Sequence, residues 1–132
     1  MPSAISRWWL WLPVVLYMAF IFGLSSISET PDLPGGSDKG LHAVLYAGLG
    51  ALLVRALAGG LGRRITLATA LIATLVGGLY GVSDEFHQYF VPPRQVEALD
   101  VVADTIGTAV AAFALFGWSR ARGSKPPPGE RL

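Results

Sequence analysis

Residues 65–82 read ITLATALIATLVGGLYGV and contain no charged side chain. A polar stretch follows them, and residues 101–118, VVADTIGTAVAAFALFGW, then form a second, mostly apolar run. A helix needs about 20 predominantly apolar residues to cross the hydrocarbon layer of a bilayer. Two such runs around a short polar connection predict a pair of transmembrane helices rather than part of a soluble domain.

Two further apolar runs precede this pair. They are residues 8–27, WWLWLPVVLYMAFIFGLSSI, and residues 41–57, LHAVLYAGLGALLVRAL. Of the 132 residues, 52% are hydrophobic and 14% are charged, whereas soluble domains carry about 25% charged residues. The sequence therefore predicts an all-α membrane protein, a bundle of four transmembrane helices. Pro13 is expected near the start of the first helix, where a missing backbone donor costs least.

The absence of cysteine and the positions of the small residues add detail to the predicted bundle. The chain has no cysteine, which excludes disulfides and thiolate chemistry. Small residues recur within the spans and would let helices approach closely. They are Gly48, Gly50, Ala51, Gly77, Gly78, Gly107, Ala111 and Ala112.

The distribution of basic residues predicts the orientation of the bundle. Most of them fall on one side of the four spans. They are Arg7, Arg63, Arg64, Arg120, Arg122, Lys125 and Arg131. Because loops rich in Lys and Arg stay in the cytoplasm, we expect both termini to be cytoplasmic and the acidic loops to face outward. Residues 1–122 would form the membrane domain, and residues 123–132 a disordered, Pro-rich cytoplasmic tail.

Residues 80–107, YGVSDEFHQYFVPPRQVEALDVVADTIG, concentrate ionisable groups beside apolar spans. Polar pairs spaced by four residues recur at the predicted outer ends of three spans. These pairs are Asp38 and His42, Asp84 and Gln88, and Asp100 and Asp104. Residues four apart share one face of a helix, so the pairs are expected at one depth. A short polar helix or re-entrant segment is expected over residues 83–90, before the fourth span.

Each polar residue also has a purely structural interpretation. Asp38 and Asp100 are placed to cap helix N-termini. Tyr46 is near interfacial depth, where aromatic rings often anchor a helix. His42 and Asp104 lie about one turn inside their spans, where an ionisable side chain is costly unless it is paired or faces water. A buried network that holds the helices together and a functional pocket are both open from the sequence.

The same residues carry a resemblance to a known family. Residues 37–53, SDKGLHAVLYAGLGALL, and 83–108, SDEFHQYFVPPRQVEALDVVADTIGT, resemble the two motifs of the VanZ-like family of bacterial integral membrane proteins. Asp104 stands where the family often has Asn, and Pro93 where it often has Gly. The matching positions are Asp38, Lys39, His42, Tyr46, Asp84, Glu85, Gln88, Arg94, Asp100 and Gly107.

The resemblance implies a multi-pass protein of the bacterial inner membrane, but it implies no established reaction. The founding member is linked to low-level resistance to the glycopeptide teicoplanin. The first hypothesis is therefore an envelope factor that binds an envelope component at an outward-facing polar site. For that site, the binding residues would be Asp38, Lys39, Tyr46, Gln88 and Asp104.

The alternative is an outer-leaflet enzyme that acts on a lipid-linked phosphate or another anionic cell-wall precursor. Its catalytic residues would be His42, Asp84, Glu85, His87, Arg94 and Asp100. Arg94 would clamp the anion, and His42 or His87 would transfer protons. Carboxylates beside a histidine also suit Mg²⁺ or Mn²⁺, although the two histidines lack a metal-site spacing. A small transporter is less favoured because the inner halves of the spans are apolar. The partner we expect is the lipid bilayer, and nucleic-acid binding has no support.

Overall fold

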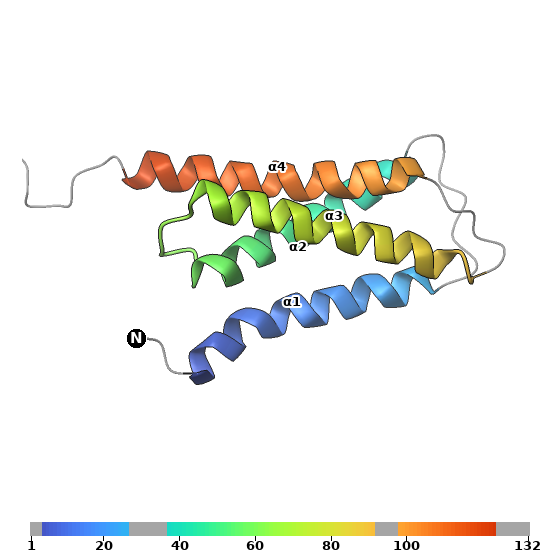
Figure 1. Ribbon diagram of the computed structural model, residues 1–132, viewed down its shortest axis with the longest axis horizontal. Helices are drawn as coiled ribbons and strands as arrows, with labels where there is room; N and C mark the ends of the chain where they lie inside the picture. Colours follow the sequence, from blue (N-terminus) through green and yellow to red (C-terminus); the bar gives the residue numbers. More distant parts are fainter. Residues whose placement is uncertain (1–3, 27–36, 92–97, 124–132) are drawn as a thin grey trace, which may run out of the picture.

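The computed structural model describes residues 4–26, 37–91 and 98–123, which form a bundle of four helices (Figure 1). The helices are α1 (Ala4–Ser25), α2 (Ser37–Ala58), α3 (Leu67–Gln88) and α4 (Ala98–Gly123). No strand occurs in these three ranges. Each helix is long and apolar enough to cross a membrane. The predicted all-α architecture with four membrane spans is therefore confirmed.

The segment expected to interrupt the chain before the fourth span is instead helical. α3 continues through residues 83–88, and only Tyr89, Phe90 and Val91 leave the helix in a turn. The prediction of a separate short helix or re-entrant segment was wrong for this described part. A continuous helix satisfies its own backbone hydrogen bonds, so polar side chains at this depth require no break in the backbone.

Pro13 lies well inside α1 because that helix begins at Ala4. The prediction that Pro13 stands near the helix start was therefore wrong. A proline at this position removes one backbone hydrogen bond and crowds the preceding turn. Figure 1 shows the first part of α1 turned away from the direction of the rest of the helix, which is the bend that an internal proline produces.

α4 makes the most extensive contacts in the bundle, with α2 and α3, whereas α1 packs mainly against α2. Small residues allow these contacts of α4, as the sequence predicted. A Cβ added to Gly50 would lie 2.7 Å from the carbonyl oxygen of Thr108, and one added to Gly107 would collide with the backbone of Ala43.

Two tyrosine hydroxyls form hydrogen bonds between α1 and its neighbouring helices. Tyr17 donates to the Leu45 carbonyl at 2.6 Å, and Tyr80 donates to the Met18 carbonyl at 2.5 Å.

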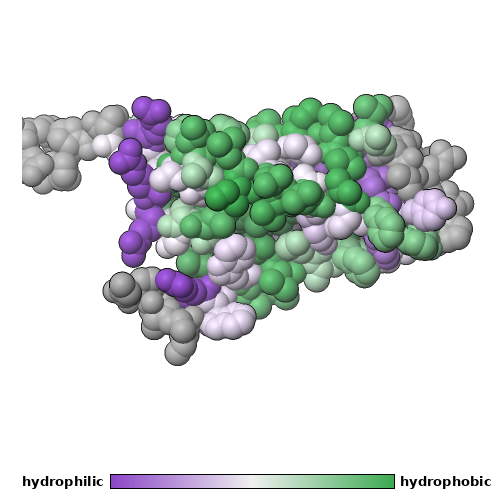
Figure 2. Space-filling view, viewed as in Figure 1, coloured by the Kyte–Doolittle hydropathy of each residue, from purple (hydrophilic) through white to green (hydrophobic). Residues whose placement is uncertain are grey.

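The outer surface of the bundle suits a lipid environment. Large apolar side chains such as Leu16, Leu75 and Val110 are exposed on its sides. Figure 2 shows hydrophobic residues along the length of the bundle and hydrophilic residues mostly at its ends. This distribution is the reverse of a soluble protein's and is expected where the solvent is hydrocarbon.

The two ends of the bundle carry different charges. Arg63 and Arg64, between α2 and α3, lie at the end where α4 finishes, and Arg122 donates to the Arg63 carbonyl at 3.4 Å. The start of α1 lies at this same end (Figure 1). The acidic side chains of α3 and α4 lie at the opposite end. The charge separation along the bundle is thus present, while the side of the membrane that each end faces stays a prediction.

Candidate functional site

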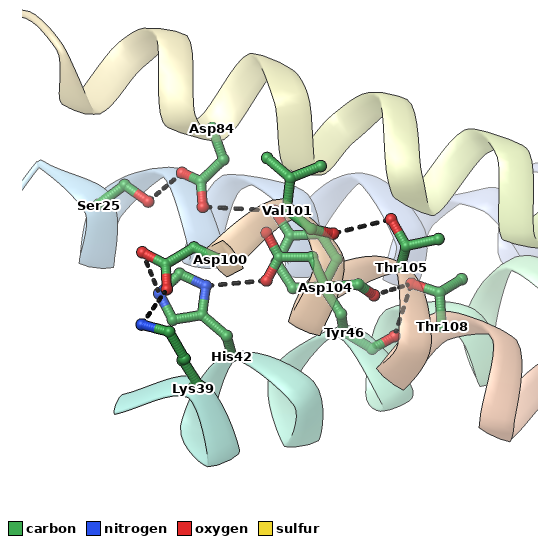
Figure 3. A network of polar contacts seen from close by, with 10 residues as sticks. All are labelled: Ser25, Lys39, His42, Tyr46, Asp84, Asp100, Val101, Asp104, Thr105 and Thr108. Carbon is green, nitrogen blue, oxygen red and sulfur yellow. Dashed lines mark hydrogen bonds and ion pairs between the residues drawn. The ribbon is translucent and has the colours of Figure 1, made fainter. Parts of the chain in front are cut away.

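The end of the bundle opposite these arginines contains a group of interacting polar side chains from all four helices. We call it the polar cluster. Its members are Ser25, Lys39, His42, Tyr46, Asp84, Asp100 and Asp104 (Figure 3). α2 contributes His42 and Tyr46 one turn apart, and α4 contributes Asp100 and Asp104 with the same spacing. The spacing of four places each pair on one helix face, and the close contact of α2 with α4 brings the faces together.

His42 lies between two aspartates of α4. Its Nδ1 is 2.8 Å from Oδ1 of Asp104, and its Nε2 is 4.0 Å from Oδ2 of Asp100. Lys39 Nζ lies 3.5 Å from Oδ1 of Asp100. His42, Asp100 and Asp104 are buried, whereas the Lys39 side chain is 36% exposed. A line of alternating basic and acidic groups therefore runs from the half-exposed Lys39 to the buried Asp104.

Asp84 of α3 forms the other half of the cluster. It accepts hydrogen bonds from the Ser25 hydroxyl and, at 3.3 Å, from the Tyr46 hydroxyl. No basic side chain lies within ion-pairing distance of Asp84 in the described part of the chain. Within the described ranges, the Asp84 carboxyl group thus has two neutral hydroxyl donors and no cationic partner.

Asp104 is the most deeply placed acid, with 0% of its surface exposed. Thr108, one turn further along α4, donates to the Asp104 backbone carbonyl at 2.8 Å. The second carboxylate oxygen of Asp104, Oδ2, is buried and has no hydrogen-bond partner among the described residues. It faces α3, because a Cβ added to Gly81 would lie 3.0 Å from it.

These positions create a set of atoms that suits a metal ion. One ligand atom each from His42, Asp84 and Asp104 lies within 4.8 Å of the others, and all three residues are buried. Imidazole nitrogen and carboxylate oxygen are ordinary ligands of divalent metals in proteins. The same histidine, with a carboxylate near each ring nitrogen, is also suited to accept and return a proton.

His87, predicted as an alternative proton carrier, lies apart from this cluster. Its Nε2 is 2.9 Å from the Ser26 hydroxyl, and its ring stacks on Phe22 with 4.1 Å between centroids. It makes no hydrogen bond or ion pair with the cluster's carboxylates in the ranges that the structure describes. His87 therefore belongs to the contact between α1 and α3.

The remaining predicted site residues have different positions. Glu85 and Gln88 are buried at the end of α3. Asp38 lies in the first turn of α2, but its side chain is outside the described set. Arg94 lies outside the described residues, as do residues 124–132 of the predicted tail, whose first residue, Gly123, ends α4. Of the predicted set, the structure thus brings together Lys39, His42, Tyr46, Asp84, Asp100 and Asp104.

Two features of the site differ from what the sequence suggested. Tyr46 is not an interfacial anchor, since only 1% of its surface is exposed and its hydroxyl binds Asp84. Thr108 was not among the predicted site residues, although it holds the backbone of Asp104. Its position four residues after Asp104 is the only signal in the sequence that would have indicated this contact.

The chain matches the model of the VanZ/LLP1 protein family over residues 5–119. That range contains all four spans and every member of the polar cluster. The comparisons with curated proteins and with solved structures gave no match.

Proposed function

The chain belongs to the VanZ/LLP1 family, and we propose that its polar cluster binds the headgroup of a cell-envelope component at the outer face of the bacterial inner membrane. The observation that carries the proposal is the convergence of side chains from four helices on one buried cluster at one end of the bundle. Each hydrogen bond between membrane helices contributes only modest stability, whereas burying ionisable side chains in a membrane protein is costly. A cluster with three buried aspartates exceeds that need.

The charge distribution supports an outer-leaflet ligand. Among the described residues, Arg63, Arg64 and Arg122 lie at the opposite end of the bundle, and basic ends of membrane proteins stay cytoplasmic. Lys39 is half-exposed beside the cluster and is placed to meet a headgroup arriving from the bilayer surface. We further propose that the bound component is a lipid-linked cell-wall precursor. Its sequestration would change the susceptibility of the cell to glycopeptides such as teicoplanin.

The test is binding of a purified lipid-linked cell-wall precursor to the protein in nanodiscs. We expect saturable binding that falls at least tenfold in Asp84→Asn. The matched control is Ser83→Ala, because Ser83 is exposed on the adjacent position of α3 and bonds only its own helix, to the Tyr80 carbonyl at 2.7 Å. Equal binding by both variants and the unaltered protein would remove the cluster from recognition.

A second candidate function is catalysis on the same ligand. It is favoured by the placement of His42 between two carboxylates, which suits proton transfer. Arg94 would clamp the phosphate in this version. Incubation of the protein with a lipid-linked phosphate should then release inorganic phosphate by hydrolysis, with water as the nucleophile, and His42→Gln should abolish turnover. Binding without turnover in the unaltered protein would leave recognition as the function.

A further inference from the structure

We infer that His42, Asp84 and Asp104 form a binding site for one divalent transition-metal ion such as Mn²⁺ or Zn²⁺. The three residues come from α2, α3 and α4, so the site lies where these helices meet. Their ligand atoms lie within 4.8 Å of one another, and all three side chains are buried. Residues so far apart in the sequence meet only because the bundle is folded, which makes the site a product of the tertiary structure.

An independent observation is the second carboxylate oxygen of Asp104. Oδ2 is fully buried, has no hydrogen-bond partner among the described residues and faces α3, the helix that carries Asp84. A buried acceptor without a partner destabilises the folded protein. A cation between Asp104 and Asp84 would remove that cost, and the aspartates' own oxygens would be its ligands.

The surroundings of the three ligands are those of a metal site. Histidines that bind metals usually direct their other ring nitrogen at a carboxylate, which fixes the ring. His42 does so: with Nδ1 toward Asp104, its Nε2 points at Asp100 at 4.0 Å, and Lys39 holds Asp100 in turn. The carboxylate of Asp84 is oriented by the hydroxyls of Ser25 and Tyr46. Each of the three ligands thus has an oriented environment.

A divalent ion would also match the charge that two carboxylate ligands bring. Asp84 and Asp104 are buried, and no Lys or Arg of the described residues pairs with either. Metal ligands bind in the carboxylate form, and a divalent ion would offset both charges with His42 neutral, which is the form that binds metals.

The donor set selects the kind of ion. Mg²⁺ prefers oxygen ligands alone, whereas one imidazole with two carboxylates suits Mn²⁺ or Zn²⁺. Ligands of a tetrahedral Zn²⁺ ion lie about 3.3 Å apart. His42 Nδ1 and Asp104 Oδ1 are already 2.8 Å apart, so mainly the Asp84 carboxylate must move inward. Open positions on the ion would then be free for water or a ligand.

A bound metal would also explain how an acidic pocket receives an anionic headgroup. Carboxylates repel a bare phosphate, whereas a metal with an open position attracts one. This bridging role rests on the proposed function, but metal binding itself does not. Metal binding without headgroup binding would overturn the proposed function alone, and headgroup binding without metal would overturn the metal site alone.

The experiment measures binding of Zn²⁺ and Mn²⁺ alone to the full chain in detergent, after removal of metal with a chelator. We expect one ion per chain, and a loss of affinity of about tenfold or more in Asp104→Asn and in His42→Gln. The control is Thr105→Val, which has nearly the same shape. Thr105 neighbours Asp104, but its hydroxyl bonds only its own helix, to the Val101 carbonyl at 2.8 Å.

A second measurement does not depend on the stability of a variant that lacks a proposed ligand. In the protein loaded with Mn²⁺, pulsed electron paramagnetic resonance should detect coupling to a histidine nitrogen after histidine is labelled with ¹⁵N. The coupling should be the same in His87→Gln, which leaves His42 as the one labelled histidine. The inference is overturned if no saturable binding occurs, if ¹⁵N coupling is absent, or if Asp104→Asn and His42→Gln bind as tightly as Thr105→Val.

Discussion

Replacing Gly107 by alanine tests whether the close contact of α2 and α4 sets the geometry of the polar cluster. Gly107 lies three residues after Asp104, and a Cβ added there falls against the backbone of Ala43, the residue after His42. This Cβ would lie 2.9 Å from the Ala43 Cα, whereas ordinary contacts begin at 3.4 Å. The helices must therefore separate by about 0.5 Å or more, because packed backbone atoms have no room to move aside.

The expected cost follows from two opposing effects. Three backbone atoms of Ala43 would lie within 3.0 Å of the added Cβ, so the cost of overpacking should fall in the upper part of its usual range, at about 2–3 kcal/mol. The better helix propensity of alanine returns about 1 kcal/mol. Gly107→Ala should therefore lower the free energy of unfolding by about 1–2 kcal/mol. The same separation would stretch the 2.8 Å contact between His42 and Asp104 toward the limit of a hydrogen bond, at about 3.2 Å. Metal binding should weaken with it.

The assay is unfolding of the purified protein by a denaturing detergent, followed by circular dichroism. Gly117→Ala is the matched control, because it lies on the same helix and no atom is within 4 Å of its added Cβ. It should be as stable as the unaltered chain or slightly more so. Equal stability of Gly107→Ala and Gly117→Ala would refute the claim that the backbones of α2 and α4 touch at this point.

Three further predictions concern the cluster and its orientation. Tyr46→Phe should lower the free energy of unfolding by about 1–2 kcal/mol, because Asp84 loses a buried donor; an unchanged unfolding midpoint would contradict the contact. Asp104→Asn should raise the free energy of unfolding of the metal-free protein by about 1 kcal/mol. The asparagine amide oxygen still accepts from His42, and the amide nitrogen can donate toward Asp84. Added metal should no longer stabilise this variant. Lower stability of the metal-free variant would contradict that reasoning. In intact cells, a membrane-impermeant maleimide should label Gly40→Cys, at the polar end of α2, but should label Gly62→Cys only after lysis; the reverse pattern would place the polar cluster on the cytoplasmic side.

Much of the fold was predictable because the bilayer imposes a simple requirement on the sequence. A span must be apolar for about 20 residues, and four such runs specify four helices. The polar residues at the end of α3 were harder to interpret. Charged side chains in a sequence suggest a break in a membrane helix, but the break is unnecessary when those side chains face other helices. Residues 83–88 are helical for this reason, with Asp84, Glu85 and Gln88 buried.

Six residues of the polar cluster were among those that the sequence singled out, but their contacts were not predictable. They are Lys39, His42, Tyr46, Asp84, Asp100 and Asp104. The spacing of four residues is enough to predict that His42, Asp100 and Asp104 lie at one depth. The pairing of His42 Nδ1 with Asp104, rather than with Asp84 or Asp100, depends on the rotation of α2 against α4. The rotation depends on the close contact of Gly107 with the backbone of Ala43. The sequence shows that Gly107 is small, but it does not show which residue Gly107 contacts. His87, like His42, stands near acidic residues in the sequence. In the structure its ring instead stacks on Phe22 of α1.

The energetics of the cluster favour binding over structural support. The glycine contacts already hold α2 against α4, so the bundle does not need Asp104 to keep these helices together. A buried carboxylate oxygen without a partner lowers the stability of the metal-free bundle. A side chain kept only for stability would be an asparagine, which satisfies His42 and donates toward Asp84 at the same time. Aspartate at this position gives up that hydrogen bond and leaves a carboxyl oxygen directed toward α3. A cation bound by that oxygen would compensate for the lost hydrogen bond, so stability and metal affinity should change in opposite directions on substitution.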